Sequence, residues 1–239
     1  MIPAGALRWK ALSQEFWLLP QRALWWEAKS ALMVSDLHLA KAEHFRSQGL
    51  QVPPTVDAQT LSELTRLLTR LKPNTLLVLG DLFHSAPNKA WDDFGRWLQD
   101  EHRAGLAEAV LVLGNHDRAS SERYEAMGMA VVDRWEAENV CCTHAPDDEV
   151  PKGQWVHFCG HVHPAARLRG AGRQHERVPC FHAASTGCDA GLRMVLPAFG
   201  KFTGTHAVEP RRGSEVFLVA ENAVLGPWKP EGVTRRGRR

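Results

Sequence analysis

The sequence TLLVLGDLFH, residues 75–84, decides the fold. Its first five residues form an apolar run that ends at Gly80-Asp81, and a short apolar run bounded by a turn residue is typical of a buried strand. An acid directly after such a strand lies at the strand's carboxyl end, which is where open α/β sheets bind their ligands. The stretch therefore predicts a sheet with a ligand-binding edge.

Two similar stretches flank this one. Residues 31–35 form an apolar run before Asp36, and residues 109–113 form another before Gly114. Around these runs, apolar side chains recur at intervals of three and four residues, which is typical of amphipathic helices. We expect the helices over residues 53–72, 91–102 and 120–127. This alternation of strand and helix predicts parallel strands joined by crossover helices.

The rest of the chain predicts β-structure. Residues 15–19 and 23–27 are short apolar runs separated by Pro20-Gln21, a pattern typical of an antiparallel hairpin. In the second half helical periodicity nearly disappears, and short strand candidates follow one another at residues 130–132, 140–143, 156–159, 166–168, 178–181, 193–196, 215–219 and 223–225. We expect a second, more antiparallel sheet packed on the first. The predicted fold class is α/β, with a second half of α+β character.

Length and composition limit the class of protein. The chain has 239 residues, of which 44% are hydrophobic and 23% charged, so a largely disordered chain is excluded. No run approaches the roughly 18 apolar residues that a membrane-spanning helix needs, and we expect no membrane partner. Lysine and arginine number 29 and aspartate and glutamate 27, which leaves a net charge of +2 that predicts no partner by itself.

No linker divides the chain, so we expect a single domain over residues 1–233 and a disordered basic tail over the arginine-rich residues 234–239. The five cysteines contain no C-x-x-C pair, which argues against a thiolate zinc site. Their odd number, with no secretory signal pattern at the N-terminus, favours buried thiols in a reducing compartment. We therefore expect a cytoplasmic protein.

Five short motifs follow predicted strands: Asp36-x-His38, Gly80-Asp81-x-x-His84, Gly114-Asn115-His116-Asp117, Thr143-His144 and Gly160-His161-x-His163. Because the carboxyl ends of the strands converge, we expect these side chains to lie together. They offer seven candidate metal ligands, namely Asp36, His38, Asp81, Asn115, His144, His161 and His163. Oxygen and nitrogen donors without thiolate suit manganese, iron, zinc or cobalt. Seven ligands exceed one tetrahedral ion and suit two ions that share a carboxylate.

In this order the five motifs resemble those of the calcineurin-like metallophosphoesterase superfamily. The resemblance implies a β-sandwich of two mixed sheets flanked by helices. It also implies that Asp36, His38 and His163 hold one ion, that Asn115, His144 and His161 hold the other, and that Asp81 bridges the two. His116 matches the superfamily's catalytic histidine, which contacts a phosphate oxygen or the leaving group, and Asp117 matches the acid that orients it.

Further segments resemble a narrower group, the bacterial ligase-associated DNA damage response endonucleases. They are residues 36–41 (DLHLAK), Phe45-Arg46, residues 49–53 (GLQVP), residues 178–181 (VPCF) and residues 196–204 (LPAFGKFTG). This resemblance implies a single-strand DNA endonuclease of DNA repair. Among the metals that the donor set suits, we expect Mn²⁺. The resemblance also implies DNA as a partner, together with the DNA ligase and the helicase of the same repair cluster.

The residues leave some roles open. His84 can contact a bridging water or substrate, orient Asp81, or pack locally. Lys41 and Arg46 can clamp a phosphodiester or remain solvated. The same ligand set also suits a phosphodiesterase, pyrophosphatase or phosphatase acting on small nucleotides. A metal-stabilised repair scaffold without turnover is the alternative from another functional class.

Overall fold

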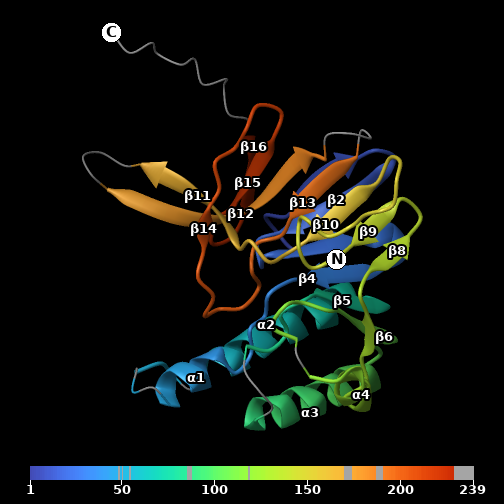
Figure 1. The fold of residues 1–239 in the computed structure, drawn as a ribbon, viewed down its shortest axis with the longest axis vertical. Helices are drawn as coiled ribbons and strands as arrows, with labels where there is room; N and C mark the ends of the chain where they lie inside the picture. Colours follow the sequence, from blue (N-terminus) through green and yellow to red (C-terminus); the bar gives the residue numbers. More distant parts are fainter. Residues whose placement is uncertain are drawn as a thin grey trace.

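Two mixed β-sheets pack face to face, and helices cover the outer face of one of them (Figure 1). The computed structural model describes residues 1–47, 49, 51–53, 55–84, 88–117, 119–169, 174–186 and 191–228. The arrangement confirms the predicted fold class of two mixed sheets with flanking helices. The predicted tail, residues 234–239, lies outside the described residues.

The first sheet has seven strands in sequence order. They are β1 (Leu7–Ala11), β2 (Gln14–Leu19), β3 (Ala23–Trp26), β4 (Ala31–Val34), β5 (Thr75–Leu79), β6 (Glu108–Val112) and β7 (Ala130–Val132). Strands β1 to β4 pair antiparallel, and β4 to β7 pair parallel, as the alternation of strand and helix predicts. β7 was expected in the second sheet, but it extends the first because it pairs with β6. Its three residues carry no signal that distinguishes the two sheets.

The helices α1 (Lys41–Ser47), α2 (Val56–Leu71), α3 (Lys89–Arg103) and α4 (Ser121–Ala126) form the crossovers and lie together on one side in Figure 1. A short 3₁₀ turn, η1 (Glu27–Lys29), precedes β4. On α2 the buried residues Leu64, Leu67 and Leu68 recur at helical spacing and pack into the layer beneath the first sheet. Each such leucine stabilises the fold by about 1.5–3 kcal/mol. Among these described helices, none has the length and apolarity that crossing a membrane requires.

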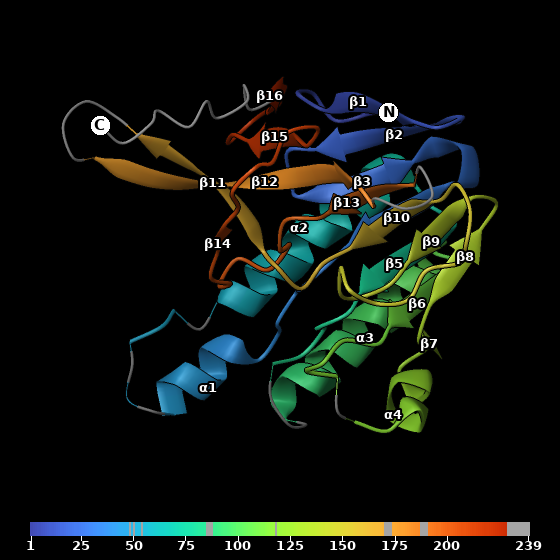
Figure 2. The same cartoon turned by 45° about the horizontal axis from the view of Figure 1, so that its top comes forward.

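The second sheet contains β8 (Trp135–Ala137), β9 (Val140–Cys142), β10 (Val156–Cys159), β11 (Pro164–Arg169), β12 (His175–Ser185), β13 (Leu192–Val195), β14 (His206–Ala207), β15 (Glu215–Val219) and β16 (Val224–Trp228). Most of its pairs are antiparallel, as expected, but β10 pairs parallel with both β9 and β13. This parallel part carries three of the candidate ligands on the loops after β9 and β10. The β11–β12 hairpin projects from the body of the molecule (Figure 2).

A single aromatic-rich core joins the two sheets. Phe16 on β2 meets Phe158 on β10 edge to face, with ring centroids 4.8 Å apart. Phe181, Phe217 and Met194 of the second sheet belong to the same buried cluster. Because side chains alternate along a strand, the neighbours of these residues point to the outer face of the second sheet.

Candidate metal centre

The site lies where the carboxyl ends of both sheets meet. The first sheet contributes Asp36 and His38 after β4, Asp81 after β5 and Asn115 after β6, and the second contributes His144 after β9 and His161 and His163 after β10. Backbone hydrogen bonds join these loops, from Asp36 N–H to the Gly80 carbonyl (3.1 Å) and from Gly160 N–H to the His144 carbonyl (2.9 Å). The structure thus brings all seven predicted ligands to one edge.

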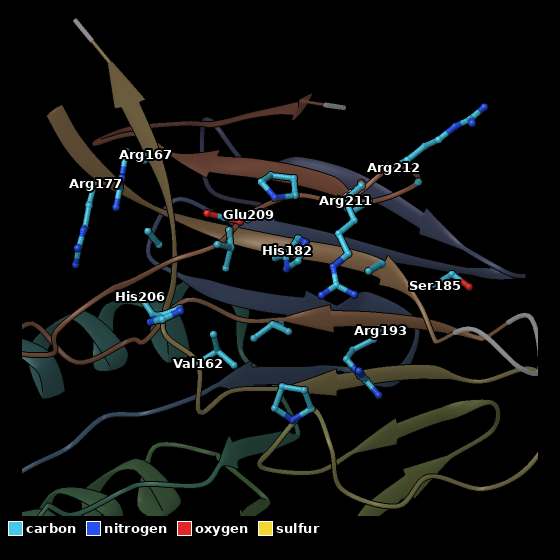
Figure 3. A pocket seen from close by; sticks show the side chains of 18 residues that line it. Val162, Arg167, Arg177, His182, Ser185, Arg193, His206, Glu209, Arg211 and Arg212 are labelled. Atoms are coloured by element: carbon cyan, nitrogen blue, oxygen red, sulfur yellow. Dashed lines mark hydrogen bonds between the residues drawn. The ribbon is translucent and has the colours of Figure 1, made fainter. Parts of the chain in front are cut away.

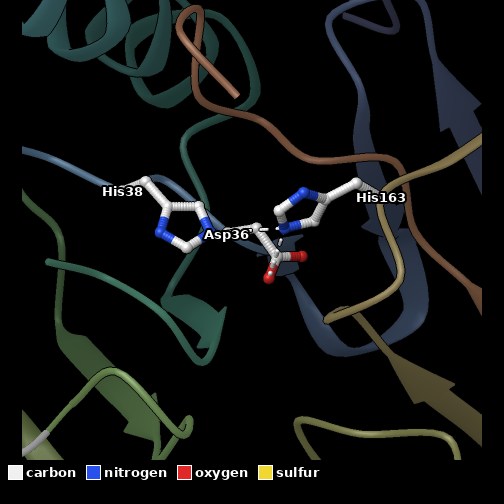
Figure 4. A group of neighbouring side chains, drawn as sticks. All are labelled: Asp36, His38 and His163. Atoms are coloured by element: carbon white, nitrogen blue, oxygen red, sulfur yellow. Dashed lines mark hydrogen bonds and ion pairs between the residues drawn. The ribbon is translucent and has the colours of Figure 1, made fainter. Parts of the chain in front are cut away.

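One group of candidate ligands consists of Asp36, His38 and His163 (Figure 4). His163 Nε2 lies 3.2 Å from Asp36 Oδ1 and 3.2 Å from His38 Nε2. The carboxylate of Asp36 is buried, and both of its oxygens accept from the N–H of His161 at 3.1 and 3.0 Å. The same backbone bond therefore fixes Asp36 and ties it to the loop that carries His163.

The second group consists of Asp81, His144 and His161, with Asn115 beside them. His144 Nε2 lies 2.9 Å from Asn115 Oδ1, 3.1 Å from His161 Nδ1 and 3.5 Å from Asp81 Oδ1. Its other ring nitrogen, Nδ1, lies 3.0 Å from the Leu79 carbonyl. A carbonyl can only accept, so Nδ1 carries the proton and the lone pair of Nε2 points into the group.

This arrangement fits a metal cation in each group. His163 repeats the pattern of His144, because its Nδ1 lies 3.2 Å from the Gly204 carbonyl and its Nε2 faces a carboxylate. Metal-ligating histidines commonly donate their other ring N–H to a backbone carbonyl in this way. Lone pairs that converge in a buried place repel one another unless a cation lies between them. The mixed nitrogen and oxygen donors suit a divalent transition metal.

Asp81 connects the two groups. Its Oδ2 lies 3.6 Å from His38 Nε2 of the first group, and its Oδ1 lies 3.5 Å from His144 Nε2 of the second. Oδ1 also accepts from the N–H of His116 at 2.9 Å. One buried carboxylate with an oxygen toward each group occupies the position that a bridging ligand of a two-metal site requires.

The backbone at the site is strained. Five of the seven candidate ligands have left-handed φ angles, namely Asp36 (53°), His38 (47°), Asp81 (52°), His161 (67°) and His163 (51°). Non-glycine residues in this region cost on the order of 1–3 kcal/mol each, and such strain persists where the surrounding structure enforces it. The loops therefore hold their ligands in conformations that local preference disfavours, which is common at functional sites.

Two motif glycines allow close approach of backbone to ligand. A Cβ at Gly80 would overlap the ring of His144, and Gly80 itself has a φ of +77°. A Cβ at Gly160 would overlap the carboxylate of Asp36 and lie 2.6 Å from the Cβ of Ser35. Glycine is therefore required at both positions by the space that the ligands occupy.

His116 and His84 lie beside the first group. The ring of His116 is centred 5.3 Å from the ring of His38, and it stacks on His84 with 5.0 Å between centroids and 27° between planes. The ring of His84 is in turn 5.5 Å from that of His38. Both histidines thus border the candidate metal centre, where His116 is predicted to act. The ring of His84 packs at the site and not away from it.

Asp117 is buried and bonded to backbone. Its carboxylate accepts from the N–H of Asp81 (2.8 Å), Gly114 (2.9 Å) and Leu82 (3.1 Å), and from the hydroxyl of Tyr124 (3.4 Å). Burial raises its pKa to about 6, against the lowering effect of the backbone N–H groups. These contacts join the two loops that carry Asp81 and Asn115, so an effect of Asp117 on His116 passes through the loop backbone.

The two predicted cationic residues differ in placement. Lys41 starts α1 and is half-buried, and burial lowers the pKa of its ammonium while the charge of Asp81 opposes that shift. Lys41 therefore lies within electrostatic reach of the metal centre. Arg46 donates to the Pro53 carbonyl at 3.3 Å, on the segment between α1 and α2.

Sequence reasoning missed several supporting residues. Asp57 accepts from the N–H of Ala40 at 2.9 Å and so fixes the loop after His38. His157 is buried next to Thr143, which precedes His144, with Nε2 2.7 Å from the Thr143 hydroxyl. Neither residue belongs to a motif, and each contact depends on tertiary packing, so the sequence carried no signal for them.

Comparison with known proteins gave matches of two kinds. A family model described as calcineurin-like phosphoesterase matches residues 30–182. The structure of the nuclease MPE of Pseudomonas putida is similar, with 31% identity and a TM-score of 0.71 over 92% of this chain and 100% of that one. Yfce, a phosphoesterase of E. coli, matches with 13% identity and a TM-score of 0.46 over 82% of this chain and 96% of that one. No curated protein matched.

Proposed function

The chain belongs to the calcineurin-like phosphoesterase family, and from this premise we propose that it is a single-strand DNA endonuclease that uses two divalent metal ions. The coarser activity, a metal-dependent phosphoesterase, follows from the family itself. The observation that carries the proposal is the placement of Asp81, whose two oxygens face different ligand groups. A bridging carboxylate is typical of two-metal hydrolysis of phosphate esters.

Each ligand has a proposed role. Asp36, His38 and His163 would hold one ion, Asn115, His144 and His161 would hold the other, and Asp81 would be shared between them. When bound, the two ions supply a water of lowered pKa and neutralise charge on the phosphate. The backbone bonds around Asp36 and Asp81 keep the ligand atoms in place before substrate arrives.

We assign His116 to the reacting phosphate. The ring of His116 lies at the edge of the site beside His38, and the backbone N–H of the same residue donates to Asp81 Oδ1. From there the side chain donates a proton to the leaving oxygen or steadies a phosphate oxygen. General acid catalysis of this kind accelerates a reaction by about 10²–10⁴. His84, stacked on His116, restricts the orientation of that ring.

Several observations support a DNA substrate and a setting in repair. The matched nuclease of Pseudomonas putida is 31% identical over nearly the whole chain. The segments that resemble ligase-associated repair endonucleases support single-stranded DNA, and a DNA ligase and helicase as partners. Cys141, Cys142, Cys159 and Cys180 are buried free thiols, which is consistent with a cytoplasmic location.

We propose Mn²⁺ as the metal. After removal of metal with a chelator, Mn²⁺ should restore DNA cleavage and Ca²⁺ should not. Ca²⁺ prefers six to eight oxygen ligands, whereas this set contains four imidazoles. Equal restoration by Ca²⁺ would contradict the assignments of His144, His161 and His163.

Circular single-stranded DNA tests the substrate, because it has no ends and only an endonuclease can cut it. The Mn²⁺-loaded protein should linearise the circle, and Asp81→Asn should not. Hydrolysis of a nitrophenyl phosphodiester without cutting of the circle would instead indicate an enzyme of small nucleotides. A protein that binds metal and turns over neither substrate would be a scaffold.

A further inference from the structure

A large basic groove lies on the outer face of the second sheet (Figure 3). Its volume is about 1020 Å³, at the upper end of the roughly 300–1,000 Å³ of typical small-molecule sites. Its lining includes the arginines Arg167, Arg177, Arg193, Arg211 and Arg212, whereas Glu209 is the one acid among the described lining residues. The whole chain has a net charge of only +2, so this positive charge is a local feature.

The groove adjoins the metal centre. Val162 lines it and lies in the chain between the ligands His161 and His163. The N–H of His206, another lining residue, donates to the His163 carbonyl at 2.9 Å. The segment that carries His161 and His163 therefore also forms part of the border of the groove.

Four of the five arginines lie in two pairs toward opposite ends of the groove. Arg167 and Arg177 are direct cross-strand partners on the β11–β12 hairpin. Like charges at such a position destabilise a hairpin unless an anion lies near them. At the other end Arg211 extends over the groove toward the strand of Arg193, while Arg212 points away (Figure 3).

Two of these guanidinium groups are held in place by one bond each. Arg193 Nε donates to His157 Nδ1 at 3.2 Å, and the opposite nitrogen of that buried ring lies 2.7 Å from the Thr143 hydroxyl. Arg177 donates through Nη1 to the Thr205 carbonyl at 3.0 Å. Each guanidinium has five N–H donors, so most donors remain for an anion, and the fixed fork loses little entropy on binding it.

The lining selects a backbone rather than a base. Phenylalanine, tyrosine and tryptophan, whose rings commonly stack on bases in single-strand binders, are absent from the described lining residues. Burial lowers the pKa of His182 on its floor, so the arginines supply the positive charge. Arginine forks match the geometry of phosphate oxygens.

We propose that this groove binds the sugar-phosphate backbone of single-stranded DNA next to the phosphodiester at the metal centre, without regard to sequence. The inference rests on the proposed function, because it takes the metal centre as the place of cleavage. Binding of this kind releases counterions, so the affinity falls as the salt concentration rises. On a plot of the logarithm of the binding constant against the logarithm of the salt concentration, each phosphate contact contributes about −0.7 to the slope.

The test compares two double variants of equal charge. Arg177→Ala/Arg211→Ala removes one arginine from each end of the groove, and Arg96→Ala/Arg103→Ala removes two exposed arginines from α3 on the helical side. kcat/KM is measured on an oligonucleotide across a salt series and on a nitrophenyl phosphodiester. The groove variant should lose about tenfold or more in kcat/KM on DNA, mainly through a higher KM. The slope of log(kcat/KM) against log salt concentration should be smaller in magnitude by about 1.4, because two phosphate contacts are lost.

The nitrophenyl diester should be hydrolysed equally by all three proteins, because it does not reach the groove. Arg177→Lys/Arg211→Lys should recover the salt slope, and equal melting temperatures would show that the fold is intact. Equal DNA kinetics in the groove and control variants would overturn the groove and leave the proposed function standing. A wild-type protein that hydrolyses only the small diester would overturn the proposed function and the groove with it.

Discussion

The role of His116 can be tested separately from metal binding. Its ring borders the first group of candidate ligands, and the bond to Asp81 comes from its backbone N–H. We expect His116→Ala to retain both ions and to lose about 10²–10⁴ in kcat/KM on DNA, whose alkoxide leaving group needs a proton. Nitrophenolate leaves without one, so a nitrophenyl phosphodiester should lose less. Metal content and kcat/KM on both substrates make the measurement.

The exposed His175 provides a matched control, because His175→Ala removes an imidazole that belongs neither to the ligand set nor to the lining of the groove. Equal losses on both substrates in His116→Ala would mean that the ring steadies a non-bridging oxygen instead. Loss of one ion would make His116 a ligand. Unchanged DNA cleavage would remove it from the mechanism.

His157 makes stability depend on pH. Burial and the neighbouring Arg193 lower its pKa to about 4, against an opposing attraction from Asp148. The unfolded chain binds the proton with a pKa near 6.5, so stability is complete above about pH 6.5 and is lost as the pH falls toward 4. Between pH 7.5 and 5 this group should cost about 2 kcal/mol of unfolding free energy.

Urea unfolding at the two pH values measures this cost. His157→Gln keeps a donor and an acceptor between Thr143 and Arg193 but does not titrate, so its stability should change less over the same interval. An identical pH dependence in wild type and variant would contradict the assignment.

At the scale of elements, the loops after the strands depend on small residues. Gly160→Ala would place a Cβ against the carboxylate of Asp36, on the loop that follows β10. We expect the variant to fold and to lose affinity for an ion of the first group, with a matching loss of turnover. Isothermal titration calorimetry with Mn²⁺ measures the affinity.

Gly95→Ala serves as the control for that change. Gly95 lies within α3, where a Cβ would lie 3.3 Å from the flexible side chain of Met127. Alanine is favoured over glycine by about 1 kcal/mol inside a helix. Metal affinity should therefore be unaffected, and equal affinity in Gly160→Ala and Gly95→Ala would contradict the role of Gly160.

The elements that could be predicted were those with an uninterrupted signal. β5 is an apolar run that ends at a glycine, and its bounds match the prediction residue for residue. β1 was missed although its apolar residues alternate strictly with an exposed arginine and lysine, which is the signal of a half-buried strand. β8 and β14 are too short to show a pattern. α1 was missed because its seven residues include only two apolar positions, too few to show a helical pattern.

The candidate ligands could be selected from sequence because each follows a predicted strand and belongs to a motif. The supporting network could not be predicted. The bond between His157 and Arg193 depends on the register in which β10 pairs with β13, and these residues lie 36 positions apart. The basic groove depends in the same way on segments that fold onto the second sheet from different parts of the chain.

At the scale of the whole molecule, we propose that residues 1–233 form one cooperative domain. Phe16 and Trp26 of the first sheet and Phe158 of the second lie in the same buried cluster, and the candidate metal ligands come from both sheets. Urea unfolding followed by tryptophan fluorescence and by far-ultraviolet circular dichroism should give coincident curves. Two separated transitions would show that the sheets unfold independently.

The central claim is that one carboxylate, Asp81, bridges two metal ions at the junction of the sheets. The most direct measurement is the number of Mn²⁺ ions bound per chain, together with kcat/KM on single-stranded DNA, in wild type and in Asp81→Ala. The wild type should bind two ions. The variant should bind fewer and lose activity by about a thousandfold or more, because both ions lose a ligand at once. Two bound ions and near-wild-type turnover in Asp81→Ala would contradict the account.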